Sequence, residues 1–499
     1  MSNVKGEQKK ALLHLLYSEN KDNIDKGLQS LLDTIVELED LYFILDITKP
    51  PSNPEELFDC IPNITHKTHL KLCLLGLLVE YDVEWVVKLT HLDLRYHELI
   101  TLPDLIFRLP NLLAFDISHN KFTHIPESIG KLTTLIALNI SSNNISTFPN
   151  SIGNLKNLMY LDATWNPLIR NSSGFVMENQ KISLAYSNLY SIPECITKLK
   201  MLQILDLGAN PISEIPMGIE NMDGLRILHL SHNNLWNLSA IQLETFFHNI
   251  AKIPFLEELF LDNNEISFLS NSISKLQHLK ILHLEGNNIT SIPKSFQSLR
   301  QLKVLNLKGN KLTTLPSYIG DLTKLEVLDL SENKISSISE SIVKLTNLMT
   351  LNLRRNELSS ISNLFLDQLF LIISHIKSLK ILDLSCNSLP ILPEYLCNLQ
   401  GLAHLNISLN KLYYLPRSIG KNTNLRVLSA YKNQLSLLPE SLGSLHQLED
   451  LDLSSNNLST LPNSIIQLKN LSKLDIRWNR LSEGEKGKLK SISGNRFYI

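Results

Sequence analysis

The chain has 499 residues, of which 47 are basic and 49 acidic, and 43% are hydrophobic. The near balance of charge argues against a nucleic-acid partner, because such proteins usually concentrate lysine and arginine. No apolar run is long enough to span a bilayer, so no membrane insertion is predicted. One globular core of this length would be unusual, whereas a core that grows along one direction accommodates it.

Residues 1–88 contain no repeat and are predicted to be mostly helical. Apolar spacing indicates helices over 7–17, 22–45 and 68–88, with a proline-rich break at 49–56. We expect this region to cap the open end of the repeat core that follows, and an independent functional domain is the alternative. The polar N-terminus predicts no secretory signal. The 5 cysteines form no C-x-x-C or framework spacing, which favours a reducing, cytoplasmic compartment.

From 89 to 481 an asparagine recurs, mostly every 23 residues, in the frame L-x-x-L-x-L-x-x-N-x-L. We call the ninth position of this frame the ladder position. It occurs 17 times between His97 and Asn479, and it is Asn everywhere except at His97 and Ser187. A fixed period of this kind predicts a solenoid of about 17 repeats, in which stacked units build a core that no single unit could form.

Each unit predicts a strand, a turn and a short helical segment. In 302–325 the apolar residues first alternate with polar ones and then recur every three or four residues. The amide of Asn310 can bond the backbone of its own turn and of the neighbouring turn. In 11 units proline follows six residues after the ladder position, where it would start the convex segment because it needs no donor. The predicted fold class is α/β, with a curved, parallel concave sheet and short helices or turns on the convex side.

Two stretches carry a family resemblance. LPSYIGDLTKLEVLDLSENKI (315–335) and LPESLGSLHQLEDLDLSSNNL (438–458) resemble the 23-residue L-P-x-x-I-x-x-L class of leucine-rich repeat proteins. That class includes the Ras-group scaffolds of animals and related plant and bacterial proteins. The resemblance covers about 89–481 and implies a leucine-rich-repeat solenoid that acts as a non-enzymatic interaction module. It implies no particular partner, because the class motif is structural.

Three intervals depart from the common spacing. Between Asn166 and Ser187, residues 167–181 are interpreted as an irregular convex loop, either a neutral deformation or a binding loop. Two eight-residue insertions predict amphipathic helices over 239–253 and 362–376. Their apolar faces are expected to pack on the convex side, with a partner-docking ridge as the alternative. The residues of these faces are Ile241, Phe246, Phe247 and Ile250 in the first, and Leu366, Leu369, Phe370 and Ile373 in the second.

The last segment, 482–499, predicts a helix followed by a short apolar strand. Together these would cap the other end of the solenoid.

The concave side offers the candidate binding surface. Strand alternation places one residue per unit in a line that we call the concave column. Its members are Asp93, Asp116, Asn139, Asp162, Ser183, Asp206, His229, Phe260, His283, Asn306, Asp329, Asn352, Asp383, Asn406, Ser429, Asp452 and Asp475. A polypeptide could lie along this trough, with the carboxylates attracting its basic side chains.

Aromatic residues on this polar face are the strongest candidates, because tryptophan and tyrosine are frequent in binding hot spots. Tyr160, Trp165 and Tyr186 are predicted to form one contact patch beside the irregular loop, and Asp162 is a further candidate contact. Local covering of a distorted stack is the alternative. The second set of candidates comprises Phe260 with Asp262, the pair Arg354 and Arg355, and Tyr431 with Arg477 and Trp478.

No phosphate-binding glycine loop, H-E-x-x-H, G-x-S-x-G or EF-hand pattern occurs in the sequence. No catalytic residue, metal site or cofactor is therefore predicted. The leading hypothesis is a non-enzymatic cytoplasmic scaffold or adaptor, active in signal transduction, that binds a protein on its concave face. Two alternatives stay open: an immune or host-directed ligand sensor that signals through its N-terminal helices, and an enzyme with a site in 1–88. No oligomeric state is predicted.

Overall fold

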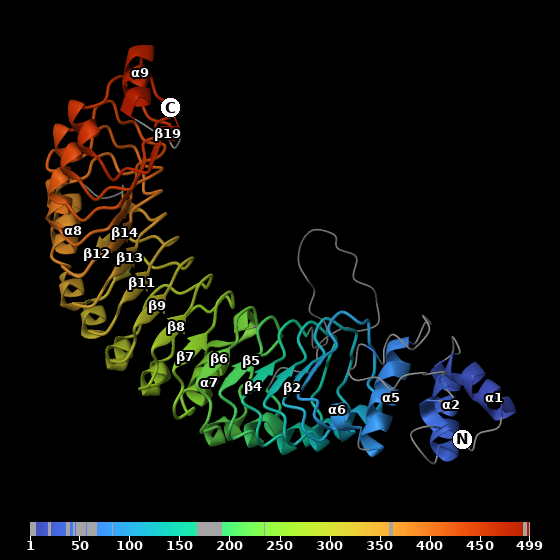
Figure 1. The fold of residues 1–499 in the computed structure, drawn as a ribbon. Coiled ribbons are helices and arrows are strands. Elements are labelled where there is room, and N and C mark those ends of the chain that lie inside the picture. Colours follow the sequence, from blue (N-terminus) through green and yellow to red (C-terminus); the bar gives the residue numbers. More distant parts are fainter. Residues whose placement is uncertain are drawn as a thin grey trace. The chain divides into compact units, whose positions relative to one another are not determined.

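The chain forms two compact units, Met1–Asn233 and Asn234–Ile499. In the computed structural model the described residues are 6–17, 21–35, 40–42, 45, 56, 67–81, 83–166, 192–233, 235–358, 363–492 and 497–498. Within each unit short parallel strands form the concave layer, and 3-10 helices and turns form the convex layer (Figure 1). The predicted architecture of a leucine-rich-repeat solenoid is confirmed in both units.

The first unit begins with helices. Helix α1 (Gly6–Leu16) packs against α2 (Lys21–Thr34), and α5 (Lys67–Glu80) packs against the 3-10 helix η1 (Asp104–Arg108). The predicted helix 22–45 is interrupted after Thr34, and residues 40–42 are again helical. The predicted helix 68–88 is divided into α5 and α6 (Glu84–Val87).

The solenoid of the first unit follows. Its strands pair in parallel in the order β1 (His91–Asp93), β2 (Ala114–Asp116), β3 (Ala137–Asn139), β4 (Tyr160–Asp162), β5 (Ile204–Asp206) and β6 (Ile227–His229). Its convex layer continues from η1 with η2 (Glu127–Lys131), η3 (Asn150–Asn154), η4 (Glu194–Lys198) and η5 (Met217–Asn221).

The second unit repeats the arrangement. Its strands pair in parallel in the order β7 (Glu258–Phe260), β8 (Ile281–His283), β9 (Val304–Asn306), β11 (Val327–Asp329), β13 (Thr350–Asn352), β14 (Ile381–Asp383), β15 (His404–Asn406), β16 (Val427–Ser429), β17 (Asp450–Asp452), β18 (Lys473–Asp475) and β19 (Phe497–Tyr498). A separate small pair joins β10 (Thr314–Leu315) and β12 (Ser337–Ile338).

The convex layer of the second unit contains η6 (Leu235–Asn237), α7 (Ala240–Ile250), η7 (Asn271–Lys275), η8 (Lys294–Ser298), η9 (Ser317–Asp321), η10 (Glu340–Lys344), α8 (Asn363–Ser374), η12 (Glu394–Asn398), η13 (Ile419–Lys421), η14 (Glu440–Ser444) and η15 (Asn463–Gln467). After the last coil come α9 (Glu483–Ile492) and β19, so the predicted helix and strand at the C-terminus are confirmed.

The residue pattern of one coil explains its shape. Leu305 and Leu328, in the middle of paired strands, are fully buried, whereas Asn306 and Asp329 after them are half-buried on the concave side. Proline immediately precedes many of the 3-10 helices, with φ between −74° and −62°. Where proline is missing, the Ser270 and Ser339 hydroxyls accept hydrogen bonds from backbone N–H groups instead.

The predicted asparagine ladder is confirmed. Asn310 Nδ2 donates to the carbonyl of Leu284 in the preceding coil at 2.8 Å and to that of Leu307 in its own coil at 3.0 Å. Its Oδ1 accepts the backbone N–H of Ile289, also in the preceding coil, at 3.0 Å. Because these backbone groups are buried between coils and no strand pairs them, the asparagine side chain satisfies them.

The predicted repeat at Ser187 does not stand between β4 and β5 in the sheet, because these two strands pair directly. Asp162 pairs in register with Asp206, and Asn210 Nδ2 donates to Ala163 O at 3.0 Å. The carbonyl of Ala163 belongs to the coil of Asn166, so the ladder passes directly from Asn166 to Asn210. Residues 167–191 lie outside the described residues. The repeat frame at Ser187 is assigned from the spacing of residues along the chain. Spacing along the chain does not decide which strands pair.

Both inserted segments form the predicted helices, α7 and α8. Phe246, Phe247 and Ile250 of α7 are buried, as are all four predicted residues of α8. Ile241 is an exception, with an exposed fraction of 81%. It precedes the buried Leu243 by two residues, which is about 200° around a helix, and therefore lies on the opposite face.

The glycine in several 3-10 helices permits close stacking of coils. A Cβ atom added at Gly320 would collide with the backbone oxygen of Ser341 in the next coil, whereas one added at Gly487 of α9 would meet nothing within 4 Å. We therefore expect Gly320→Ala to lower the unfolding free energy by roughly 1–3 kcal/mol through overpacking. Gly487→Ala should instead raise it, by up to roughly 1 kcal/mol, because alanine favours helix. Chemical unfolding measures the unfolding free energy of both variants. A change in the same direction for both would contradict the prediction.

Candidate protein-binding face

The predicted aromatic patch lies on the coil of β4 in the first unit. Tyr160 begins β4 and Asp162 ends it, and the Tyr160 hydroxyl donates to Asp162 Oδ2 at 3.4 Å. Trp165, three residues further on, is 67% exposed. Its φ of 51° is a left-handed conformation that costs an ordinary residue roughly 1–2 kcal/mol. The third predicted member, Tyr186, lies outside the described residues.

The direct pairing of β4 with β5 places two carboxylates side by side. Asp162 Oδ1 accepts hydrogen bonds from the N–H and the hydroxyl of Thr164, at 2.9 and 2.8 Å. Asp206 Oδ1 accepts the N–H of Gly208 at 3.0 Å, and His229 Nδ1 lies 4.0 Å from Asp206 Oδ2. No lysine or arginine of the described residues forms an ion pair with either carboxylate. Sequence reasoning missed this pair because it placed Ser183 between the two aspartates.

Burial and neighbouring negative charges raise the pKa values of Asp206 and Tyr160. Burial raises the pKa of Asp206 above its usual value, and the neighbouring Asp162 raises it further, despite the opposing hydrogen bond from Gly208. Burial, followed by the charges of Asp162 and Asp206, raises the pKa of Tyr160 to about 12. The face over β4 and β5 is therefore a site where negative charge is costly in the isolated protein.

Asp206→Asn is expected to stabilise the protein at neutral pH. Because the pKa of Asp206 is raised in the folded state, the folded protein loses stability as pH rises from the unfolded pKa through the folded pKa. The amide removes this loss and keeps an acceptor for Gly208, so the variant should melt higher at pH 7 and equal the wild type in acid.

Asp475→Asn is the matched control of opposite sign. Burial raises the pKa of Asp475, but the hydrogen bonds from Arg477 outweigh this and lower it overall. Its stabilising contribution is present above the unfolded pKa and is lost as pH falls through the folded pKa. Melting curves across pH for both variants test the assignment, and a lower melting temperature for Asp206→Asn at pH 7 would contradict it.

Four of the predicted candidates of the second unit fall into two separate groups. The rings of Phe260 and His283 lie 4.8 Å apart, and Asp262 Oδ1 accepts the N–H of Glu285 at 2.7 Å. Arg354 and Arg355 follow β13, which is separated from β7 by the strands β8, β9 and β11. Arg355 contacts Glu332 at 3.7 Å. Phe260 and Asp262 thus belong to one local cluster, and the arginine pair to another.

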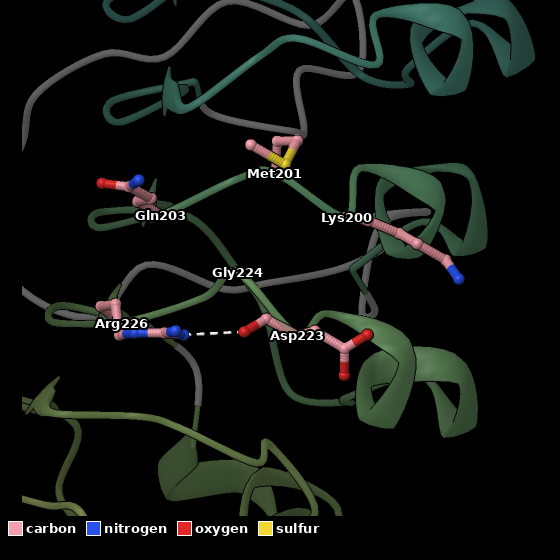
Figure 2. A pocket seen from close by; sticks show the side chains of 6 residues that line it. All are labelled: Lys200, Met201, Gln203, Asp223, Gly224 and Arg226. Carbon is pink, nitrogen blue, oxygen red and sulfur yellow. Dashed lines mark hydrogen bonds between the residues drawn. The ribbon is translucent and has the colours of Figure 1, made fainter.

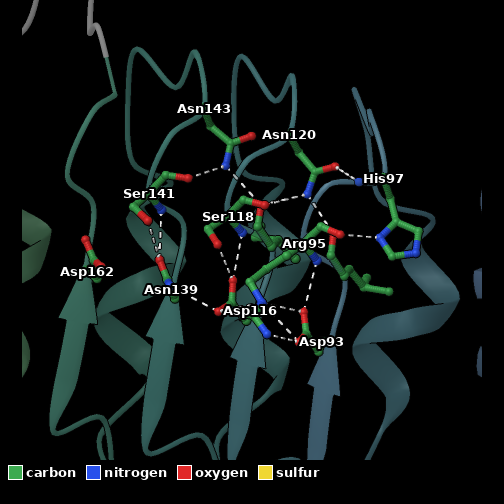
Figure 3. A network of polar contacts seen from close by, with 12 residues as sticks. Asp93, Arg95, His97, Asp116, Ser118, Asn120, Asn139, Ser141, Asn143 and Asp162 are labelled. Atoms are coloured by element: carbon green, nitrogen blue, oxygen red, sulfur yellow. Dashed lines mark hydrogen bonds and ion pairs between the residues drawn. The ribbon is translucent and has the colours of Figure 1, made fainter.

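Two arginines on the concave face bind neighbouring aspartates, and only one of them was among the predicted candidates. Arg95 Nε lies 3.0 Å from both carboxylate oxygens of Asp93 and 3.7 Å from Asp116 Oδ2 on the adjacent strand (Figure 3). Arg477 Nε donates to Asp475 Oδ1 at 3.0 Å, and its guanidinium lies over the rings of Trp478 and Tyr498, at 5.1 and 4.8 Å from the ring centres. The sequence signal that could have found both is Asp-x-Arg at the end of a strand.

An open cleft lies on the side of the coils that precede β5 and β6. Figure 2 shows its lining, which includes Lys200, Met201, Gln203, Asp223 and Arg226, with the Arg226 guanidinium donating to the Asp223 carbonyl at 2.7 Å. The lining mixes charges of both signs. Among the described residues no group of three potential metal ligands occurs, and no described helix is long and apolar enough to cross a bilayer.

Comparisons with known proteins identify the family. Models described as leucine-rich repeat region and leucine rich repeat match 295–372, 254–312, 423–481, 111–132, 134–155 and 378–399. The chain is 33% identical to a structurally characterised leucine-rich repeat (LRR) protein of Leptospira interrogans, over 83% of this chain and 96% of that one, with a TM-score of 0.71. The chain belongs to the leucine-rich repeat proteins.

More distant structures share the fold of this LRR protein. An internalin of Listeria monocytogenes, InlF, is 20% identical, with coverage of 89% of this chain and 97% of that one and a TM-score of 0.52. TLR13, in a complex with the RNA ssRNA13, is 24% identical, with coverage of 83% and 60% and a TM-score of 0.59. No curated protein matches the chain. The fold of the leucine-rich repeat family indicates a protein–protein interaction domain.

Proposed function

We propose that this LRR protein is a non-enzymatic cytoplasmic scaffold or adaptor in signal transduction, of the 23-residue class, that binds a protein partner on its concave face. The supporting observation is Trp165, a large aromatic side chain that is exposed and held in a left-handed backbone conformation. The equivalent position is glycine in two coils of the second unit, Gly286 and Gly309, but other residues, such as Ser142 and Lys432, adopt the same conformation in other coils. The conformation therefore belongs to the repeat, and the exposed indole at this position is what supports binding.

The concave sheet suits this function because it is pre-organised. Its strands are fixed by backbone hydrogen bonds and its ladder by bonds from asparagine side chains to the backbone. A partner would therefore bind with little loss of conformational entropy in the LRR protein. We infer that the contact residues are Tyr160, Asp162, Trp165 and Tyr186 in the first unit, and Phe260, Asp262, Arg354 and Arg355 in the second.

The end segments are proposed to act as caps. The leucines of α5 are buried, and this helix packs against η1 beside the first coil. At the other end, β19 pairs with β18 through the hydrogen bond from Ile476 N to Tyr498 O at 2.9 Å. We therefore assign 1–88 and 482–499 to capping and 89–481 to the solenoid.

Binding by point variants of the full chain tests the proposed function. After a partner has been captured and purified, its affinity should fall roughly 30-fold for Trp165→Ala, the loss of about 2 kcal/mol typical of a hot spot. Met217→Ala is the control, because Met217 is equally prominent at 74% exposure but lies on the convex η5. Equal affinity for the wild type and Trp165→Ala, or loss of binding only on removal of 1–88, would contradict the proposal. The second result would instead favour the sensor hypothesis.

A further inference from the structure

At three places along the concave column, two paired strands each carry an aspartate at the same register position, so the two aspartates lie side by side. The register pairs are Asp93 with Asp116, Asp162 with Asp206, and Asp452 with Asp475. Like charges opposite each other on adjacent strands are destabilising, so each pair requires a neutralising cation or carries a cost.

The chain neutralises two of these pairs with its own arginines. Arg95, two residues after Asp93, contacts both carboxylates of the first pair. Arg477, two residues after Asp475, hydrogen-bonds that carboxylate, and the charges of both Asp475 and Asp452 raise its pKa. In both coils the guanidinium lies above the strand ends on the concave side, where its planar group of donors matches a carboxylate.

The third pair has no such residue. The positions equivalent to Arg95 and Arg477 are Thr164 and Gly208, and these two are neighbours: a Cβ added at Gly208 would lie 3.7 Å from Thr164 Cγ2. Both are too short to fill the space that an arginine occupies in the other coils. Among the described residues, the basic side chain that pairs with this site is His229, whose Nδ1 lies 4.0 Å from Asp206 Oδ2.

The coil of β4 shares two further features with the coil of β18, although β4 begins with Tyr160 and β18 with Lys473. Each ends its strand with an aspartate, Asp162 or Asp475, and each carries an exposed tryptophan three residues later. Trp165 and Trp478 have φ values of 51° and 56° and exposed fractions of 67% and 69%. In the β18 coil the guanidinium of Arg477 lies between the carboxylate and the indole. The β4 coil has the carboxylate and the indole without the arginine.

We propose that the concave face over β4 and β5 binds an arginine side chain of a protein partner, with its guanidinium held by Asp162 and Asp206 and stacked on Trp165. This inference rests on the proposed function and names the chemistry of the partner at that face. Arginine fits better than lysine, because only a planar guanidinium can both bond a carboxylate in two places and stack on an indole. The chain's own Arg477 shows that the geometry is attainable on this scaffold.

A short peptide tests the inference without a known partner. The full chain is labelled with 5-fluorotryptophan, and its 4 tryptophan signals are assigned by single Trp→Phe variants. Acetyl-Ala-Arg-Ala-amide is then titrated, with the neutral citrulline peptide as its control. We expect the arginine peptide to shift the Trp165 signal and leave the Trp85 signal unchanged, and the citrulline peptide to shift neither. Equal shifts from both peptides would overturn the inference.

Thr164→Arg is the decisive variant, because it would supply the missing arginine from within the chain, as Arg477 does. It should abolish the response of Trp165 to the peptide, whereas Thr164→Gln, of comparable length without charge, should retain it. With a purified partner, Thr164→Arg should lower affinity roughly 10- to 100-fold, the effect of losing hydrogen bonds to charged groups. Melting curves of both variants verify folding.

The possible failures are distinguishable. A partner that is sensitive to Trp165→Ala but binds Thr164→Arg as well as the wild type would overturn this inference and leave the proposed function intact. A response of Trp165 to the peptide that appears only after Arg170 and Lys181 are changed to glutamine would also overturn it, because the occupant would then be the chain itself. A partner that binds Trp165→Ala with the same affinity as the wild type would contradict the proposed function. The peptide titration would still decide whether the site binds arginine.

Discussion

Asn310→Ala should destabilise the second unit strongly. The substitution removes hydrogen bonds to Leu284 O, Leu307 O and Ile289 N, all of them buried between coils. A buried backbone group left without a partner costs roughly 1–3 kcal/mol, and here several groups lose their partner at once.

Hydrogen exchange locates this effect, because the amide of Ile289 donates to Asn310 Oδ1. Its protection should fall in Asn310→Ala, together with the unfolding free energy measured in urea. Asn288→Ala is the matched control: Asn288 is a half-buried residue of the neighbouring coil whose side chain makes one long bond, to Glu265 O at 3.4 Å. If the two variants were equally stable, the ladder would not hold the coils together as described.

Phe246→Ala should have the second large effect. Phe246 is 2% exposed, and its ring meets that of Phe247 edge-on at 5.8 Å between ring centres. Truncation of a buried phenylalanine typically costs roughly 3–5 kcal/mol, from lost transfer free energy and the cavity left behind. We expect a lower melting temperature of the second unit and faster hydrogen exchange along α7.

Ile241→Ala on the same helix provides the comparison. Ile241 is almost fully exposed, so its truncation should change the unfolding free energy by less than roughly 0.5 kcal/mol. The capping box formed by Ser239 and Gln242 keeps the helix start intact in both variants. A large loss for Ile241→Ala would mean that this residue is covered in solution, which would favour a role of α7 in contacts beyond its own unit.

The repeat frame predicted most of the fold because each of its positions has a physical function. Leu305 must be buried for the coil to have a core, and Asn310 must satisfy backbone groups that the sheet leaves unpaired. Such requirements recur in every coil, so they leave a periodic record in the sequence. The same reasoning located α7 and α8, since an insertion with helical apolar spacing must bury that face somewhere. It misplaced Ile241, because that residue is two positions out of phase with Leu243.

The sequence by itself therefore determined the solenoid, the exposed position of Trp165, and the ladder and concave column except at Ser187 and Ser183. All of these depend on local spacing. Only the tertiary structure decided that β4 pairs with β5, because pairing depends on which backbone N–H and C=O groups come within reach. That one pairing brings Asp162 beside Asp206, although 44 positions separate them in the chain. A periodic sequence pattern reflects the residues that each coil requires for its own core and hydrogen bonds. Whether two charges lie side by side depends instead on which coils stack on each other.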